Sequence, residues 1–150
     1  KTNTLKRNMV FNQIFLDTNI LVDIVANRKP FSKDAIEIFD YCQRKKIKMY
    51  STSISIANLH YIAKKMVDEK ELRSIIDDLL DTISIIAITE TILRKSLKSS
   101  HKNFEDAIQI TSAQSIHNMD CIVTRDLKDF KSSEIKVFTP DEFLTKLKTQ

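Results

Sequence analysis

The sequence predicts an α/β fold in which a mostly parallel central sheet lies between two layers of helices, a three-layer α/β/α sandwich. Short apolar runs of strand character alternate with amphipathic helical segments along the chain. This alternation is typical of parallel sheets, because each crossover connection places a helix on one face of the sheet. A chain of 150 residues, 42% hydrophobic and 29% charged, has the size and composition of one globular domain. We therefore expect a single domain over residues 1–150, with its core at about 13–140.

The first elements are a strand and two helices. Residues 13–17, QIFLD, predict a short buried strand, and the segment TNILVDIVAN that follows predicts a helix capped by Thr18 or Asn19. Residues 30–46 predict a second helix, in which Ser32 can act as the cap. The apolar residues expected to share one face of this second helix are Ala35, Ile36, Phe39 and Cys42.

The middle of the chain continues the same alternation. Residues 47–52 predict a strand, and residues 53–67 a helix with Ser53 as its cap. Residues 69–83 predict the clearest amphipathic helix, whose apolar positions are Leu72, Ile75, Ile76, Leu79, Leu80 and Ile83. The remaining predicted elements are a strand at 85–89, helices at 90–100 and 103–114, and strands at 121–124 and 135–140.

Glycine is absent from the sequence. A Walker phosphate-binding loop and a dinucleotide-binding fingerprint both need glycines where the backbone approaches a phosphate. The usual ATPases, kinases and NAD-dependent enzymes are therefore excluded. Turns that need a left-handed backbone must use asparagine instead, and Asn27 and Asn118 are the candidates.

Composition and cysteine usage favour a cytoplasmic protein that does not enter a membrane. The longest apolar run, residues 85–88, is far too short to cross a bilayer, and the basic residues 1–9 are not followed by the apolar core of a signal peptide. Cys42 and Cys121 are isolated, which favours reduced buried thiols over a disulfide or a metal site. The net charge of +4 favours a polyanionic partner only weakly.

Three aspartates are expected to meet although they are far apart in the sequence. Asp17 ends the first strand, Asp126 follows the strand 121–124, and Asp106 lies in the first turn of the helix 103–114. The carboxyl ends of parallel strands share one edge of a sheet, and a helix that leads into a parallel strand begins at that edge. Three carboxylates in one place repel one another unless a cation lies among them. A hard divalent cation, Mg²⁺ or Mn²⁺, prefers such oxygen ligands and supports displacement reactions at phosphorus.

At these residues the sequence resembles the PIN-domain family over roughly residues 13–140. IFLDTNILVD is similar to the opening strand of the family, and NFEDAIQITSAQ followed by CIVTRDLKDF is similar to its second half. The resemblance implies a PIN-like fold and an endoribonuclease that hydrolyses RNA phosphodiester bonds with Mg²⁺ or Mn²⁺, commonly the toxin of a toxin–antitoxin pair. It implies that Asp17, Asp106 and Asp126 bind the metal and are catalytic. RNA is then the substrate and a small antitoxin protein a partner, while a homodimer and the number of metal ions stay open.

Other polar residues of the matching segments take auxiliary roles under this resemblance. Asn19 would support the first acid, and Glu105 and Asp129 are further acids or supports for the ligands. Asn58 stands where the family usually has a Glu on the helix after the second strand, and a neutral amide is a poorer ligand for a hard cation. The basic residues considered for RNA binding are Arg125, Lys128, Lys102 and Lys64.

Simpler roles and other functions stay open at the sequence level. An acid such as Asp106 also stabilises a helix N-terminus, with Asn103 as cap, and Asp126 could serve only a turn. Asp23 is expected on a solvated helix face. Because Asn58 replaces a charged ligand, a non-catalytic or weakly active module that binds RNA or protein is an alternative. A phosphatase is a more distant alternative, since DTN is similar to a D-x-D nucleophile motif but has Asn19 in place of the second acid.

Overall fold

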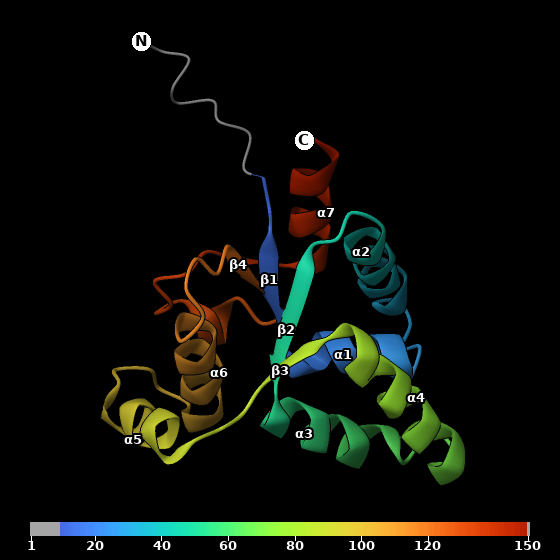
Figure 1. Ribbon diagram of the computed structural model, residues 1–150, viewed down its shortest axis with the longest axis horizontal. Helices are drawn as coiled ribbons and strands as arrows, with labels where there is room; N and C mark the ends of the chain where they lie inside the picture. Colours follow the sequence, from blue (N-terminus) through green and yellow to red (C-terminus); the bar gives the residue numbers. More distant parts are fainter. Residues whose placement is uncertain (1–9, 150) are drawn as a thin grey trace.

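The computed structural model describes residues 10–149, and the basic residues 1–9, considered above as the start of a signal peptide, lie outside the described part. The predicted α/β class with a central parallel sheet is confirmed (Figure 1). The strands are β1 (Gln13–Leu16), β2 (Lys48–Thr52), β3 (Ser84–Ile86), β4 (Cys121–Val123) and β5 (Val137–Phe138). The helices are α1 (Thr18–Val25), α2 (Ser32–Arg44), α3 (Ser53–Ala63), α4 (Glu69–Thr82), α5 (Glu90–Lys98), α6 (Phe104–Gln114) and α7 (Pro140–Lys148), with a short 3₁₀ turn η2 (Lys128–Phe130).

The five-stranded sheet has the order β3-β2-β1-β4-β5, and every pairing is parallel. β1 lies at the centre, where Phe15 pairs with Tyr50 of β2 and Leu16 pairs with Val123 of β4. The chain runs from β1 outward through β2 and β3, and then returns to the other side of β1 with β4. Such a reversal of strand order, beyond the carboxyl ends of the strands, is where open α/β sheets bind their ligands.

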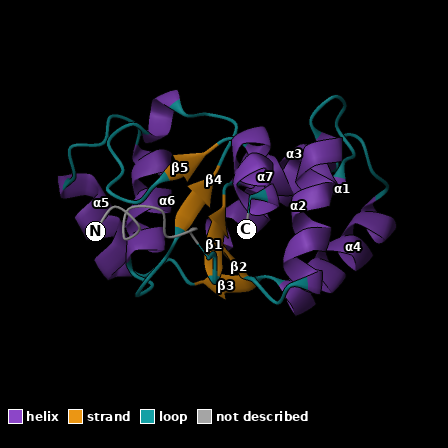
Figure 2. Ribbon diagram, turned by 90° about the horizontal axis from the view of Figure 1, so that it is seen from above, coloured by secondary structure: helices purple, strands orange, loops and turns teal. Residues whose placement is uncertain are grey.

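Helices cover both faces of the sheet. α1 to α4 and α7 lie on one face, and α5 and α6 lie on the other (Figures 1 and 2). Successive side chains of β1 point to opposite faces, so Ile14 and Leu16 belong to the core under the larger group of helices, while Phe15 belongs to the core under α5 and α6. All three side chains are fully buried. A strand that serves two cores must be apolar on both faces, and this is why Ile14, Phe15 and Leu16 contain no alternating polar residue.

The start of α1 differs from the sequence prediction. Asp17, and not Thr18 or Asn19, is the N-cap residue, with an extended backbone and a carboxylate that accepts a hydrogen bond of 2.8 Å from the N–H of Thr18. The cap therefore lies directly after β1, with no intervening loop. As a consequence, a carboxylate is held in place where the central strand of the sheet ends.

Two further helix starts also correct the prediction. Thr52, and not Ser53, caps α3, because Thr52 has the extended backbone of a cap and its hydroxyl accepts a hydrogen bond of 3.0 Å from the N–H of Ser55. The N-cap position of α2 is Phe31, which makes no side-chain cap bond. Ser32, the predicted cap, is the first helical residue and is buried.

The buried faces of α2 and α4 are narrower than predicted. On α2 the core side chains are Ala35, Ile38 and Cys42, whereas Ile36 is 37% exposed. On α4, Leu80 is 43% exposed. A helix rotates by about 100° per residue, so Ile36 points well away from Ala35, and Leu80 well away from the buried Leu79, when the axis is fixed by packing.

The last predicted strand is shorter than expected, and a helix follows it. The segment 135–140 contributes only the two residues of β5, and α7 follows, which the sequence analysis missed. A capping box starts α7: the hydroxyl of Thr139 accepts a bond from the N–H of Glu142, and the Glu142 side chain accepts one from the N–H of Thr139. Pro140 occupies the first helical position, where its missing N–H costs nothing. The sequence TPDE therefore contains the signals from which the start of α7 could have been predicted.

Other predictions about local chemistry hold. Both cysteines are buried and free. Asn27 and Asn118 have the left-handed backbone expected of them, with φ of 49° and 60°, and Lys46 is a third such residue with φ of 55°. Within residues 10–149, none of the helices has both the length and the apolar character that crossing a bilayer requires.

Candidate functional site

The carboxylate of Asp17 is the centre of a buried polar network at the carboxyl edge of the sheet. Its Oδ1 accepts hydrogen bonds from the N–H of Thr18 at 2.8 Å and from Nε2 of Gln109 at 3.1 Å. Its Oδ2 accepts bonds from the hydroxyl of Thr124 at 2.8 Å and from Nδ2 of Asn19 at 3.4 Å. Four bonds fill the acceptor capacity of a carboxylate, and the bond from Asn19 is the longest of them.

Burial raises the pKa of Asp17, since desolvation disfavours the ionised form. The hydrogen bonds from Thr124, Gln109 and Thr18 oppose this rise, and the negative charge of Asp126 adds to it. Asp17 is therefore a buried acid with hydrogen bonds that orient both of its oxygens. Its carboxylate also interacts with the charge of Asp126 in the loop that follows β4.

Asp106 lies near three other aspartates and Glu105. Burial is the largest cause that raises its pKa to about 7, and the charges of Asp129, Asp17, Asp126 and Glu105 supply the rest of this rise. The structure thus brings Asp17, Asp106 and Asp126 to one edge of the sheet, as the topology argument predicts, and adds Asp129. Within the described residues, no three Asp, Glu, His or Cys side chains are close enough together to hold a metal ion between them, so the structure shows no coordination geometry.

Asp126 and Asp129 are placed by the loop after β4. The N–H of Asp126 donates to the hydroxyl of Thr124 at 3.1 Å, and the N–H of Asp129 donates to Oδ1 of Asp126 at 3.4 Å. A hydrogen bond shared with the carboxyl group of Asp126 raises the pKa of Asp129. Both acids are exposed. They are turn residues of this loop and also members of the group of acids around Asp106.

The simpler role of Asp106 is also present. Asn103 caps α6, and its Oδ1 accepts a hydrogen bond of 3.2 Å from the N–H of Asp106. Asp106 is therefore an acid of the first helical turn, where it favours the helix. Burial, and after it the surrounding acids, raise the pKa of Asp106 and so oppose this benefit at neutral pH.

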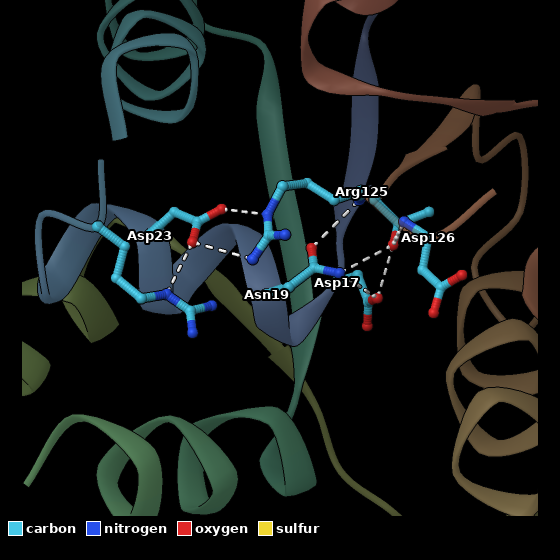
Figure 3. Close-up of polar contacts among 7 residues, drawn as sticks. Asp17, Asn19, Asp23, Arg125 and Asp126 are labelled. Atoms are coloured by element: carbon cyan, nitrogen blue, oxygen red, sulfur yellow. Dashed lines mark hydrogen bonds and ion pairs between the residues drawn. The ribbon is translucent and has the colours of Figure 1, made fainter. Parts of the chain in front are cut away.

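Asn19 links the ends of β1 and β4. Its Nδ2 donates to Asp17 and, at 3.2 Å, to the hydroxyl of Thr124, while its Oδ1 accepts a bond of 3.3 Å from the N–H of Arg125 (Figure 3). One amide therefore uses both its donor and its acceptor ends to join α1 to the loop that carries Asp126. Support of Asp17 by Asn19 was predicted from the sequence, whereas the contact of Asn19 with the loop after β4 was not.

Asp23 is not on a solvated helix face, which corrects the prediction. It is fully buried on α1 and pairs with two arginines: Arg28 Nε at 3.0 Å, and Arg125 through Nε at 2.7 Å and a second guanidinium nitrogen at 3.2 Å (Figure 3). The guanidinium of Arg125 also lies 3.8 Å from the centre of the Phe31 ring. Arg125, considered above for RNA binding, is thus engaged in positioning the loop before Asp126.

A cavity of about 460 Å³ opens beside Asp17 and Asp106. Asn58 lies in its wall, and its Nδ2 donates to Oε1 of Glu105 at 3.3 Å. Tyr61 is 61% exposed at the same cavity. The ammonium of Lys64, considered above for RNA binding, lies 4.8 Å from the centre of the Tyr61 ring.

Gln109 and Thr124 are site residues that the sequence analysis missed. Gln109 donates to Ser55 at 2.7 Å as well as to Asp17, and its Oε1 accepts from the hydroxyl of Thr52 at 2.8 Å. It thereby connects α6, α3 and the end of β2. A long amide in the otherwise small and apolar segment AIQITSA was the available indication, since a buried polar side chain needs partners.

Comparison with known proteins agrees with this arrangement. The model of the PIN domain matches residues 13–128. The chain is 25% identical over 142 residues to a curated protein named Ribonuclease VapC1 from Aquifex aeolicus (strain VF5), covering 91% of this chain and 96% of that protein. A toxin–antitoxin complex from Klebsiella pneumoniae contains a chain of similar structure, with a TM-score of 0.60, 28% identity and coverage of 85% of this chain and 97% of that one. FitAcB from Neisseria gonorrhoeae has a TM-score of 0.64 at 19% identity, with coverage of 85% and 97%.

The matched segment begins at the first residue of β1 and ends at Lys128, so it includes β1 to β4 and the acids Asp17, Asp106 and Asp126. The predicted resemblance is therefore confirmed over most of the chain. With both the sequence match and the fold in agreement, the chain belongs to the PIN-domain family.

Proposed function

We propose that the chain is an endoribonuclease dependent on Mg²⁺ or Mn²⁺, and the toxin half of a toxin–antitoxin pair. One observation carries this function: four aspartates from three segments influence one another at the carboxyl edge of the sheet, namely Asp17, Asp106, Asp126 and Asp129. Support also comes from the relative named Ribonuclease VapC1 and from the similar chain of a toxin–antitoxin complex.

Asp17, Asp106 and Asp126 are the residues that would hold the ion. They offer carboxylate oxygens, the ligands that a hard divalent cation prefers. The raised pKa of Asp106 reflects in part the repulsion that a cation would offset. The donor set therefore fits Mg²⁺ or Mn²⁺. When bound, such an ion activates water and balances the negative charge that develops at phosphorus.

The protein supplies orientation. Thr124, Gln109 and Thr18 hold both oxygens of Asp17, so this acid does not need to reorganise when substrate arrives. The bond from Asn19 to Asp17 is the longest of the four, and a new ligand to Asp17 would replace it at the least cost. The second set of bonds made by Asn19 then keeps the Asp126 loop in position.

Cleavage assays test this function directly. The purified chain should cut single-stranded or structured RNA with Mg²⁺ or Mn²⁺, stop in EDTA, and resume when excess metal is restored. Binding of RNA without new RNA ends would instead support the non-catalytic module suggested by Asn58. Trapping of a phospho-aspartate at Asp17 would support the phosphatase. Cleavage that continues at full rate in EDTA would contradict the metal-dependent function.

Asp106→Asn is expected to raise the melting temperature of metal-free protein at pH 7.5 by about 2–4 °C. The pKa of Asp106 rises from 3.8 to about 7 on folding, so its ionised form destabilises the folded state. This cost grows as pH rises from about 4 to 7 and is complete above that range, and the neutral Asn removes it. Thermal melts in EDTA at pH 4 and pH 7.5 measure the difference, which should vanish at the lower pH.

Metal should change the difference in melting temperature between the wild type and Asp106→Asn. With excess Mn²⁺ the wild type gains RT ln(1 + [L]/Kd) of stability and the variant gains less, so the melting temperatures should converge or change order. Asp77→Asn, at an exposed acid of α4, is the matched control and should not respond to either variable. A shift for Asp106→Asn that ignores both pH and metal would mean that Asp106 serves the helix terminus alone.

As a toxin, the chain would have a small inhibitory antitoxin. A positively charged side chain of that partner could lie among the aspartates and make charge-assisted hydrogen bonds with them. Isolation of the protein from its native host should then recover a small partner that suppresses cleavage. Recovery of an uninhibited nuclease alone would favour a stand-alone RNA-processing enzyme.

A further inference from the structure

A small basic cavity lies next to the aspartates. The segment before α6 and the segment around η2 enclose a cavity of about 260 Å³. Three lysines and two serines line it together with Asn103 and Asp129, namely Lys102, Lys128, Lys131, Ser100 and Ser132. Asp129 also raises the pKa of Asp106, so this acid belongs to the cavity and to the acid group at once. The two sites are therefore immediate neighbours.

The cavity carries an excess of positive charge. Across the described residues, none of the three lysines forms an ion pair with an acid. Lys128 is near enough to Asp129 to oppose the rise of its pKa, but one carboxylate cannot balance three ammonium groups. A concave site with such a surplus attracts an anion.

The walls of the cavity are fixed by the fold. Phe130, the last residue of η2, is 1% exposed and anchors that segment in the core under α5 and α6. A hydrogen bond between Nδ1 of His101 and Oγ of Ser132 joins the segment before α6 to the segment after η2. The lysines thus extend from two tethered segments, so a ligand in the cavity would not need to order a free loop.

We infer that this cavity binds a phosphate group of the RNA strand, adjacent to the phosphate that is cut. The inference rests on the proposed nuclease function. Lysine ammonium groups and serine hydroxyls are common donors to phosphate oxygens, and such contacts position a strand without reading its bases. Lys102 and Lys128, expected to bind RNA from the sequence, are then two parts of one site, completed by Lys131 and Ser132.

The placement explains how a basic protein holds RNA against an acidic edge. The aspartates alone repel a polyanion, and the neighbouring lysines attract it. Binding of one phosphate in the basic cavity holds the next part of the strand beside Asp106 and Asp126, where the acids can act with their metal. The cavity should therefore contribute both to affinity and to the position of the cut.

Direct occupancy is tested with inorganic phosphate. In a ¹⁵N-labelled sample of the full chain, titration with phosphate should shift amide signals of residues 100–103 and 128–132. The triple variant Lys102→Gln, Lys128→Gln, Lys131→Gln should lose these shifts. The matched control changes three exposed lysines over the other face of the sheet, Lys45→Gln at the end of α2, Lys70→Gln on α4 and Lys146→Gln on α7, and should retain the shifts. Equal shifts in both variants would overturn the assignment.

RNA binding is measured by fluorescence anisotropy in EDTA with a labelled single-stranded oligonucleotide. The triple cavity variant should bind about 10-fold more weakly or worse, and the slope of log K against log salt should fall by about 0.7, the contribution of one lost phosphate contact on a single strand. The control triple should lose far less, although its net charge changes equally. If the triple variant fails to fold, the same binding measurement is made on the three single Lys→Gln variants.

Neutral methylphosphonate linkages locate the phosphate. One linkage near the cut should weaken wild-type cleavage, and the same linkage should add no further loss in the cavity variant, because the two changes remove one contact. If the wild type cuts RNA and the cavity triple behaves as its control does, the cavity assignment fails while the nuclease stands. If phosphate and RNA occupy the cavity as described but the wild type never cuts, the nuclease fails and the anion site stands.

Discussion

Asp126→Asn should slow RNA cleavage by about 100-fold or more, the usual effect of removing one electrostatic group from a preorganised site. Asp126 is one of the acids that raise the pKa of Asp106 and Asp17, so it contributes charge at the place where a cation would bind. Initial rates with saturating Mg²⁺ or Mn²⁺ measure the effect. Asp17→Asn should be at least as damaging, because Asp17 is the acid held by the network of Thr124 and Gln109.

The fold should survive Asp126→Asn, so a difference in cleavage rate between this variant and the wild type would report on the site and not on unfolding. Asp126 is exposed, and the oxygen of Asn can still accept the hydrogen bond that Asp126 receives from the N–H of Asp129. Asp77→Asn on α4 removes an exposed carboxylate without touching the site and should leave the rate unchanged. Equal rates for wild type, Asp126→Asn and Asp17→Asn would remove these acids from the mechanism.

Asp23→Asn is expected to destabilise the protein by about 3 kcal/mol, which corresponds to a fall of about 6–12 °C in melting temperature for a domain of this size. Asp23 is fully buried and is the counter-charge of both Arg28 and Arg125. Removing the charge leaves two guanidinium groups without their partner. The arginines keep 33% and 26% of their side chains exposed, and this access to water places the loss at the lower end for a broken buried pair.

Thermal or urea unfolding provides the measurement, with Asp40→Asn as the matched control. Asp40 is an exposed acid on α2 that makes no ion pair within the described residues, so its loss should stay within about 0.5 kcal/mol. We also expect slower cleavage by Asp23→Asn, because Arg125 precedes Asp126 and loses its anchor. Similar melting curves for the Asp23 and Asp40 variants would show that the paired arginines are stable without their acid.

Much of the fold could be predicted because its signals are local. Apolar runs such as IFL and CIV are buried on both sides, and amphipathic spacing marks helices such as α4. Alternation of the two then requires a parallel sheet. Errors occurred where two neighbouring residues compete for one local role, as at Thr52 and Ser53, because backbone angles decide which one caps the helix.

The acids could be located because topology converts sequence position into spatial position. Asp17 after β1 and Asp126 after β4 must share an edge when those strands are parallel neighbours. The network that holds them could not be found in this way. Gln109 and Asp23 are single polar residues in helices, and nothing in their local sequence states which side of the helix the core will cover.

By itself the sequence determined the α/β class, the parallel sheet and the edge at which Asp17, Asp106 and Asp126 meet. These features depend on periodicity and chain order, which are properties of short segments. Only the tertiary structure decided that Asp23 is buried between two arginines, that Gln109 reaches Asp17, and that Lys102 and Lys131 share a cavity. Each of these depends on distances between residues remote in sequence, and such distances are set by how helices pack on the sheet.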